Sequence, residues 1–247
     1  MIKGIYSSEA AMRPKMARME VLANNLANIN TTGFKADRVF VRMLEQSAKT
    51  TADGRGDMTG VTTGKYIDTT GGSLQQTDNP LDLAIEGDGY FAVQTSRGTR
   101  LTRNGNFTLN KEGMLTTADG YPVLGVNGTI QLPQRDRIDL KSISISQSGE
   151  VVMDKEPLGQ LRIVVPEHPE VLQKDHESLM FVDQSERILD VAPERVNVRQ
   201  GFVEESNVEG IQEMIAMIEL SRGFETDQKM IQSQDATLDR SLEIGRV

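Results

Sequence analysis

The 247-residue sequence contains no cysteine and no tryptophan. Without cysteine, the chain can form neither a disulfide nor a thiolate metal site, and it has no cysteine nucleophile. Aromatic residues make up only 4% of the sequence, against 37% hydrophobic residues in total. That is few for an enzyme, whose pocket is lined mainly by large apolar side chains. We therefore expect a hydrophobic core that is thin or is shared with other molecules.

Positive charge is also scarce. The chain has 27 Lys and Arg residues against 36 Asp and Glu residues, which gives a net charge of −9. Because phosphate binding depends on clustered Lys and Arg side chains, this balance argues against a nucleic-acid-binding protein.

Long hydrophobic runs are absent as well. The longest unbroken apolar run is Met214–Ile218, far below the roughly 20 residues that span a bilayer. Residues Met1–Ile5 include one lysine, and no apolar run follows it. We therefore expect no cleaved secretory signal and no membrane insertion.

The N-terminal segment carries apolar residues on two interleaved tracks of heptad spacing, which predicts a helix with a packing seam. The members of this stripe are Ile5, Met12, Met16, Met19, Ala23 and Leu26. Pro14 is tolerated best in a first turn, so we expect the helix to begin near Arg13. The polar residues that lead to Gly33 predict its end.

The C-terminal segment shows a second helical stripe. Its heptad track consists of Met217, Phe224, Ile231 and Leu238. The interleaved positions Ser221, Gln228 and Asp235 are polar, which favours a multi-helix assembly over a dry, autonomous dimer. Ahead of this stripe, Ser206 and Glu209 have the spacing of a capping box at a helix start.

The middle of the chain changes character twice. Residues 49–80 lack periodicity and are rich in Thr, Gly, Asp and Ser, which predicts a linker or a long loop. Beyond them, short apolar runs alternate with glycine-containing turns such as Asn104-Gly105, which predicts β-hairpins. The predicted organisation is a helical segment over 1–48, a linker over 49–80, a β domain over 81–199 and a helical segment over 200–247.

This order predicts an α+β fold, with terminal helices that form a coiled-coil core and a central all-β domain. One chain has no obvious surface that would cover both apolar stripes, and soluble monomers rarely leave such stripes exposed. We therefore interpret the chain as a subunit of a larger helical assembly.

Catalytic motifs are incomplete. Gly60–Tyr66 is one residue short of a Walker A loop and lacks the hydroxyl that should follow Lys65. The two histidines, His168 and His176, show no metal-binding spacing. We predict no catalytic residue, no metal site and no cofactor.

Three carboxylates are more suggestive. Asp82, Glu86 and Asp88 could act as an acid–base pair or bind a hard cation. They surround a short apolar run and a Gly-Asp-Gly turn, and the calcium-loop pattern is not met, so we interpret them as solvated turn residues. The competing hypothesis is a peptidoglycan hydrolase that uses these carboxylates.

Four segments of the sequence resemble the bacterial flagellar rod and hook protein family. The first includes the asparagines Asn24, Asn25 and Asn28 and ends in Gly33, Phe34 and Lys35. The segments are Ala23–Lys35, Asn79–Phe91, Thr102–Phe107 and Gln200–Val208. The resemblance covers both ends of the chain and the first half of the predicted β domain, and it is weak between about 130 and 199.

The resemblance implies an axial protein of the flagellar basal body, exported through the flagellar type III apparatus without a cleaved signal. Such proteins polymerise through terminal helices, which form an inner coiled-coil tube. The rod that they build crosses the periplasm and transmits torque. The implied partners are other rod subunits, adjacent rod or hook proteins, further copies of the chain and the export apparatus.

Within the family, the length of the chain is typical of the shorter, proximal rod protein, and the distal rod protein is the alternative. We expect the two helical stripes to pack against each other and against neighbouring subunits. Asn24, Asn25 and Asn28 are expected to fix the helix register between subunits, as buried polar residues do in coiled coils. The alternative for these asparagines is an exposed position at the helix end.

Overall fold

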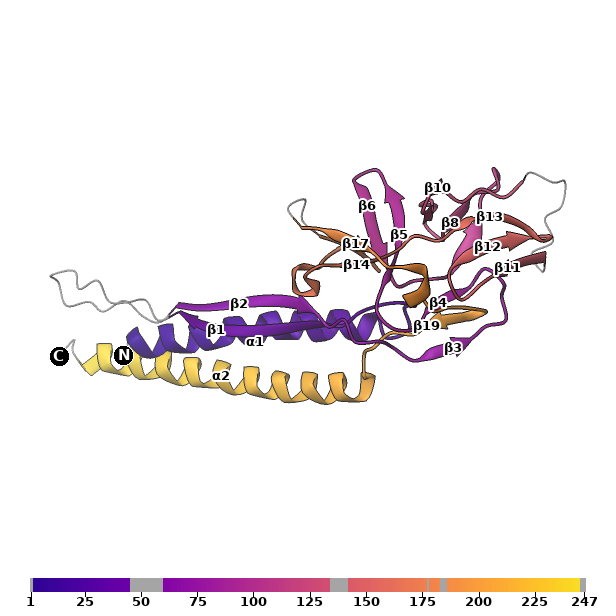
Figure 1. The fold of residues 1–247 in the computed structure, drawn as a ribbon. Coiled ribbons are helices and arrows are strands. Elements are labelled where there is room, and N and C mark those ends of the chain that lie inside the picture. The colour runs from indigo at the N-terminus through magenta and orange to yellow at the C-terminus, as the bar shows by residue number, and fades with distance from the viewer. Residues whose placement is uncertain (1, 45–59, 134–141, 177, 183–185, 245–247) are drawn as a thin grey trace. The chain divides into compact units, whose positions relative to one another are not determined.

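The computed structural model describes residues 2–44, 60–133, 142–176, 178–182 and 186–244. The chain divides into two compact units (Figure 1). The helical unit comprises Met1–Ala27, Asp37–Tyr66 and Glu209–Val247, and the β unit comprises Asn28–Ala36 and Ile67–Val208. The mixed class with a helix at each end and antiparallel strands between them is confirmed.

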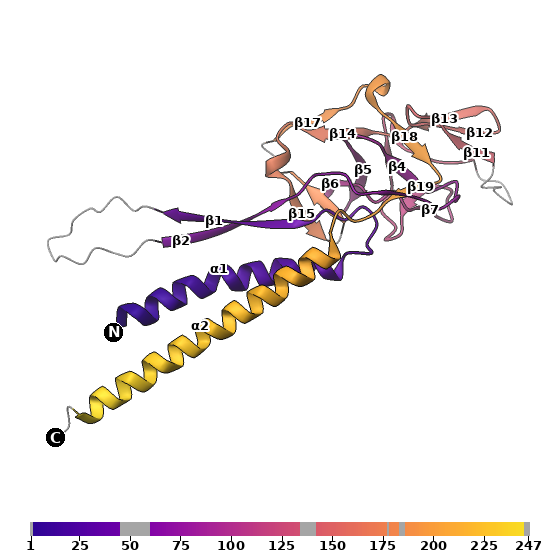
Figure 2. The same ribbon diagram turned by 90° about the horizontal axis from the view of Figure 1, so that it is seen from below.

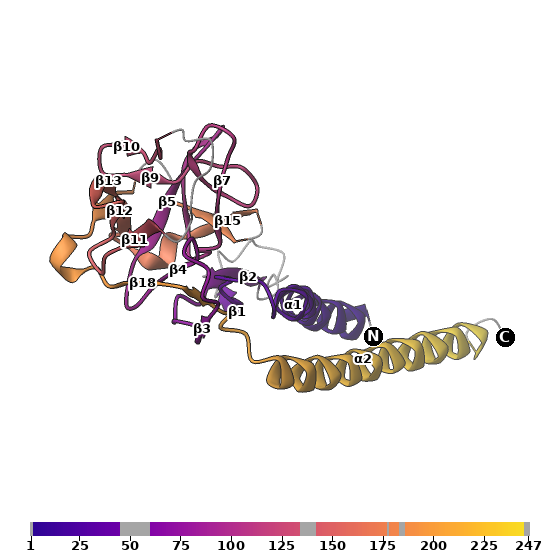
Figure 3. The ribbon, with the colours of Figure 1, turned by 90° about the vertical axis from the view of Figure 1, so that its right-hand side faces the viewer.

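The helical unit contains two helices and a two-stranded sheet. Helices α1 (Ile2–Ala27) and α2 (Gly210–Ile244) run antiparallel and pack along each other (Figure 2). Figure 3 shows the same pair as two single helices that lie side by side. Strands β1 (Asp37–Leu44) and β2 (Gly60–Ile67) form the sheet.

Both predicted helix starts are wrong. Helix α1 begins at Ile2 and continues through Pro14; because a proline removes only one backbone donor, flanking helix-forming residues and tertiary packing outweigh its cost here. Helix α2 begins at Gly210, so Ser206 lies before it. The Ser206 hydroxyl accepts a hydrogen bond from the amide of Val208 at 3.3 Å, and the expected reciprocal capping box with Glu209 is not formed.

The segment 49–80, predicted to be a linker, contains strand β2 and strand β3 (Leu74–Gln76). Residues 49–59 of this segment lie outside the described part of the chain. In the β1–β2 sheet, the rings of Phe40 and Tyr66 lie 6.5 Å apart. Gly64 makes room for Phe40, because a Cβ at this position would overlap the Phe40 ring.

The β unit is built from antiparallel strands. Its largest sheet has the strand order β15-β16-β6-β5-β14-β17, and a second sheet has the order β11-β12-β13. The strands of the six-stranded sheet are β5 (Tyr90–Thr95), β6 (Gly98–Thr102), β14 (Ile163–Pro166), β15 (Gln173–His176), β16 (Leu179–Phe181) and β17 (Ile188–Asp190). Those of the second sheet are β11 (Ile143–Ile145), β12 (Glu150–Met153) and β13 (Glu156–Gln160).

Four strand pairs complete the β unit. Two are local hairpins: β7 (Phe107–Leu109) with β8 (Leu115–Thr117), and β9 (Leu124–Gly125) with β10 (Gly128–Thr129). Two are long-range pairs that sequence patterns did not predict: β3 with β19 (Phe202–Glu204), and β4 (Leu83–Ile85) with β18 (Val198–Gln200). These pairs bring the C-terminal segment back to the first strands of the β unit.

Strand β5 is central to the core because both of its faces are buried. Phe91 and Val93 point into the larger hydrophobic cluster, and Tyr90 and Ala92 into a second cluster on the opposite face, as the two-residue period of a strand requires. Phe91 meets Phe107 edge to face, with ring centroids 5.1 Å apart. Although aromatic residues are few, two of them therefore anchor the core.

No helix in the described residues is both long and apolar enough to cross a membrane.

Asn104-Gly105 is not the predicted hairpin turn, because the strands on either side, β6 and β7, pair with other strands. The carbonyl of Gly105 instead accepts a hydrogen bond from the amide of Leu83 at 3.0 Å. A Cβ at position 105 would overlap the Leu83 carbonyl oxygen. Gly105 is therefore needed for close contact between two backbone segments.

We predict that Gly105→Ala destabilises the β unit by about 3 kcal/mol or more, because the Leu83 backbone must shift to admit the methyl group. Gly71→Ala is the matched control, because nothing lies within 4 Å of a Cβ built at Gly71. Urea unfolding followed by circular dichroism measures both changes. Equal unfolding midpoints for the two variants would contradict the close-contact role of Gly105.

Candidate functional site

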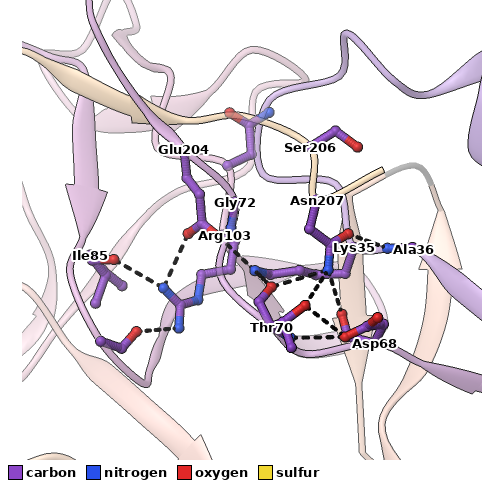
Figure 4. A network of polar contacts seen from close by, with 12 residues as sticks. Lys35, Ala36, Asp68, Thr70, Gly72, Ile85, Arg103, Glu204, Ser206 and Asn207 are labelled. Carbon is purple, nitrogen blue, oxygen red and sulfur yellow. Dashed lines mark hydrogen bonds and ion pairs between the residues drawn. The ribbon is translucent and has the colours of Figure 1, made fainter. Parts of the chain in front are cut away.

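A cluster of buried charges lies in the β unit, where segments that are far apart in the sequence meet (Figure 4). We call Lys35, Arg103 and Glu204 the ion cluster. Lys35 follows the turn after α1, Arg103 follows β6, and Glu204 ends β19. Their side chains are only 0%, 4% and 2% exposed, respectively.

The Glu204 carboxylate is at the centre of the ion cluster. Its Oε1 accepts hydrogen bonds from Lys35 Nζ at 2.6 Å and from the Gly72 amide at 2.9 Å. Its Oε2 accepts one from Arg103 Nη1 at 3.1 Å. One buried carboxylate thus pairs with two buried cations.

Each cation also binds backbone carbonyls. Lys35 Nζ donates to the Thr70 carbonyl at 2.6 Å. Arg103 donates to the carbonyls of Ile85 and Gly87 at 3.0 and 2.6 Å, which fixes the turn between β4 and β5. Burial lowers the pKa of Lys35, and the charge and hydrogen bond of Glu204 oppose this shift.

Asn207 ties together three segments that continue into the helical unit. Its side-chain oxygen accepts a hydrogen bond from the Ala36 amide at 2.7 Å. Its Nδ2 donates to the carbonyls of Asp68 and Thr70 at 3.0 and 3.1 Å. These contacts lie close to the boundaries between the units. Ala36 and Asp68 are each within two positions of a boundary, and so is Val208, the residue after Asn207. Asn207 therefore fixes, inside the β unit, the places where the chain enters and leaves it.

The turn after α1 fits this site closely. Gly33 adopts a φ of 67°, its amide donates to the Glu204 carbonyl at 2.7 Å, and a Cβ there would overlap the backbone of Asn104. Phe34 is buried, and Lys174 Nζ lies 3.8 Å from its ring centroid. Gly33 and Phe34, which the sequence analysis selected as motif residues, thus lie beside the ion cluster.

The asparagines of the same motif take different positions. Asn25 is fully buried in the helical unit, where its side chain donates to the Asp37 carbonyl at 3.0 Å and accepts from the Asp37 amide at 2.9 Å. The oxygen and the nitrogen of its side-chain amide thus both bind the Asp37 backbone of the same chain, and a register role of Asn25 between subunits stays a prediction. Asn24 is exposed, and half-buried Asn28 accepts a hydrogen bond from the Thr31 hydroxyl at 3.1 Å.

The predicted helix stripes are largely half-buried in the single chain. This applies to Met12, Met19, Leu26, Met217, Phe224 and Ile231. Met16 is 58% exposed, and the side chain of Leu238 lies outside the described residues. The α1 side chains buried most deeply are Val21, Leu22 and Asn25. A role of the stripes in packing between subunits stays a prediction.

The acidic residues considered for catalysis have structural partners. Asp82 is buried and accepts hydrogen bonds from the Thr77 hydroxyl and Asn79 Nδ2 at 2.6 and 2.8 Å. Exposed Glu86 accepts one from Asn197 Nδ2 at 2.9 Å, and Asp88 is exposed. His168 is exposed, and the His176 side chain is not described. Within the described ranges, no cluster of three or more acidic or histidine side chains is arranged to hold a metal ion.

Sequence patterns alone predict no role for Lys35, Arg103, Glu204 and Asn207. The available signal was that all four lie inside the segments that carry the family resemblance. Sequence spacing cannot reveal their pairing, because Lys35 and Arg103 are separated from Glu204 by 169 and 101 positions.

Comparison with known families gives matches over most of the chain. Residues 5–35 match the model "Flagella basal body rod protein", residues 84–153 match "Flagellar hook protein FlgE/F/G D1 domain", and residues 199–244 match "Flagellar basal body rod FlgEFG protein C-terminal". The first and last of these ranges include Lys35 and Glu204, and the middle one includes Arg103.

Full-length relatives are found in several bacteria. The flagellar basal-body rod protein FlgG of Bacillus subtilis is 33% identical over 100% of both chains. FlgF of Caulobacter vibrioides is 35% identical over 90% of this chain and 89% of its own. FlgF of Salmonella typhimurium is 34% identical over 96% of both chains.

We predict that Glu204→Gln lowers the free energy of unfolding of the β unit by about 3–5 kcal/mol. The change leaves two buried cations without a counter-charge, and breaking one side of a buried ion pair typically costs this much. Glu209→Gln, at an exposed position, is the control and should change stability by less than about 0.5 kcal/mol. Chemical denaturation measures both; equal effects would show that the ion cluster contributes no more than a surface charge.

From the position of Tyr90 beside Arg103, we predict that the free energy of unfolding changes with pH in the alkaline range. Burial, as the main cause, together with the charges of Glu204 and Asp88, raises the pKa of Tyr90 to about 12, although Arg103 opposes the shift. Tyrosine in an unfolded chain has a pKa of about 10, so the folded state binds more protons between these values. The free energy of unfolding should therefore fall by up to about 3 kcal/mol as the pH rises from about 10 to about 12. Tyr90→Phe should remove this contribution; an unchanged slope in denaturation measured across this range would exclude it.

Proposed function

This chain belongs to the flagellar basal-body rod protein family, and from that premise we propose that it is the proximal rod subunit, of the FlgF type. It is a structural subunit of the flagellar basal body. The observation that carries this conclusion is the near full-length relationship to rod proteins, with 34% identity over 96% of both chains for FlgF of Salmonella typhimurium.

Alignment length supports the proximal type. The alignments with FlgF of Rhizobium meliloti and Salmonella typhimurium span 242 and 245 positions, close to the 247 residues of this chain. The alignment with FlgG of Bacillus subtilis spans 268 positions, so that protein carries insertions relative to this chain. The alternative is the distal rod protein, favoured by the 33% identity with the same FlgG over the whole chain.

The proposed mechanism is mechanical. Helices α1 and α2 pair within the subunit and associate with helices of neighbouring rod subunits in a coiled-coil tube. A fully buried side chain of the size of Met, Leu or Phe contributes roughly 1.5–3 kcal/mol, so repeated packing along the rod resists twisting. The subunit reaches the rod through the flagellar type III export apparatus, and the rod lies in the periplasm between the rotor and the hook.

The ion cluster and Asn207 have a defined part in this mechanism. They hold the segments that link the β unit to the helices and lie inside the β unit, where the three charged side chains are buried. A load carried by the helices therefore meets a β unit whose connecting segments are fixed by charge-assisted hydrogen bonds, the stronger class of hydrogen bond.

Electron microscopy of basal bodies purified with a tagged copy of the chain tests the proposed function. The label should lie on the rod, on the side of the rotor for the proximal type and on the side of the hook for the distal type. Absence of the tagged chain from basal bodies that are otherwise complete would refute a rod function.

We also predict that Met16→Asp prevents incorporation into the rod while leaving the subunit folded. Met16 is 58% exposed in the single chain, so the substitution should change the free energy of unfolding by no more than about 0.5 kcal/mol. In an assembled tube, the same charge would be buried against a neighbour without a partner. Gln75→Asp, at an exposed position of β3 in the β unit, is the control. Swimming motility and immunoblots of purified basal bodies measure the outcome, and normal motility of Met16→Asp would exclude Met16 from subunit contacts.

A further inference from the structure

Helix α2 has apolar side chains on two opposite sides. Met217, Leu220 and Phe224 are half-buried on the side that packs in the helical unit. On the other side lie Ile211, Met214, Ile215 and Ile218, which are 73%, 46%, 53% and 55% exposed. Their spacing of three, four and seven residues places these four on one helix face. We call them the outer stripe.

Two exposed charges continue this face of α2. Arg222 follows Ile218 by one turn, and Glu225 follows Arg222 by three residues; both are exposed. Neither forms a salt bridge with any residue in the described ranges. The outer stripe thus leads into a cation and an anion that are both available to a partner.

A groove lies elsewhere in the same helical unit. It has a volume of about 610 Å³ and is lined by α1, β1, β2 and α2. Its apolar lining includes Val41 and Tyr66, which are 54% and 45% exposed. The groove is therefore open to an apolar partner along part of its wall.

The groove also contains a buried carboxylate that accepts a hydrogen bond at only one of its two oxygens. Glu213 is 4% exposed, and its Oε1 accepts a hydrogen bond from Arg38 at 2.8 Å. Its Oε2 accepts no hydrogen bond from the described residues. Since buried polar atoms in folded proteins almost always have a partner, this oxygen points to a donor that arrives from another molecule.

The groove and the outer stripe of one chain cannot satisfy each other. Glu213, Ala216 and Leu220 line the groove, and their helical positions are opposite to Ile211, Ile215 and Ile218 on the same helix. Each surface therefore needs a second molecule. A second copy of this chain supplies the complements of the groove. Its outer stripe matches the apolar groove wall, and its Arg222 matches Glu213. Its Glu225 matches Arg18, an exposed cation of the groove lining.

We propose that the outer stripe of α2 docks into the groove of a second copy of this chain, with the Arg222 guanidinium donating to Glu213 Oε2. The two surfaces differ, so the contact is heterologous and repeats from copy to copy in a ring or a helical array. This inference rests on the proposed rod function and names the two surfaces through which copies of the subunit contact each other.

Disulfide cross-linking tests the contact directly, because the natural chain has no cysteine. One copy carries Ile218→Cys and a second, with a tag of different mass, carries Tyr66→Cys; both are expressed in cells that lack the natural copy. Basal bodies are purified and oxidised. In the control, Gln228→Cys replaces Ile218→Cys; Gln228 is exposed and lies away from the outer stripe. We expect the mixed disulfide between the two tagged chains to be at least tenfold more abundant with Ile218→Cys than with this control.

The possible outcomes test the docking contact and the rod function separately. Basal bodies that contain both tagged copies but yield no mixed disulfide, or yield as much with Gln228→Cys, overturn the docking and leave the rod function standing. Failure of a tagged natural chain to enter basal bodies refutes the rod function itself.

A charge reversal decides the docking if the cysteine variants do not assemble. Arg222→Glu should reduce incorporation into basal bodies at least tenfold, because it brings a third carboxylate next to Glu213 and Glu225 of the interface. Lys229→Glu makes the same charge change two turns further along α2 and should assemble normally. Equal incorporation of the two variants overturns the contact between Arg222 and Glu213.

Discussion

The buried carboxylate of Glu204 binds two cations that come from distant parts of the chain, and the other contacts of the site depend on this pairing. Lys35 reaches it at 2.6 Å and Arg103 at 3.1 Å, with all three side chains nearly inaccessible to water. Removal of charges from water is costly, so the two buried cations depend on their contacts with this carboxylate and with backbone carbonyls. Each cation also donates hydrogen bonds to backbone carbonyls. Lys35 joins the turn after α1 to the segment before β3, and Arg103 fixes the β4–β5 turn.

The division of the chain into two units suits a rod subunit. The helical unit carries exposed apolar side chains on α1 and α2 and a groove with an unsatisfied carboxylate oxygen, all of which are features of a surface built for partners. The β unit has its own core around Phe91 and Phe107. Asn207 holds the connecting segments on the β side, so the β unit combines a hydrophobic core with a polar network around the chain segments that enter and leave it.

Local patterns predicted the elements better than their pairing. Heptad spacing identified both helices, and glycine-punctuated alternation identified the hairpins β7–β8 and β11–β12. The predictions failed where a longer-range contact outweighs a local signal: Pro14 lies inside α1, Ser206 lies outside α2, and Gly105 serves a close approach to Leu83 instead of a turn. Strands β2 and β3 were missed because polar Thr, Gly and Gln residues pair there through their backbones, which composition does not reveal.

The sequence by itself determined the class of the fold, the family and the presence of a helix at each end, because heptad repeats, strand alternation and motif strings are local properties of consecutive residues. The tertiary structure alone decided which charged residues matter. Lys35, Arg103, Glu204 and Asn207 look like ordinary polar residues in the sequence. Only the pairing of β19 with β3 and of β18 with β4 brings them together and buries the three charged side chains. Burial changes their chemistry, since a charge that is inexpensive at the surface must find a partner inside the protein.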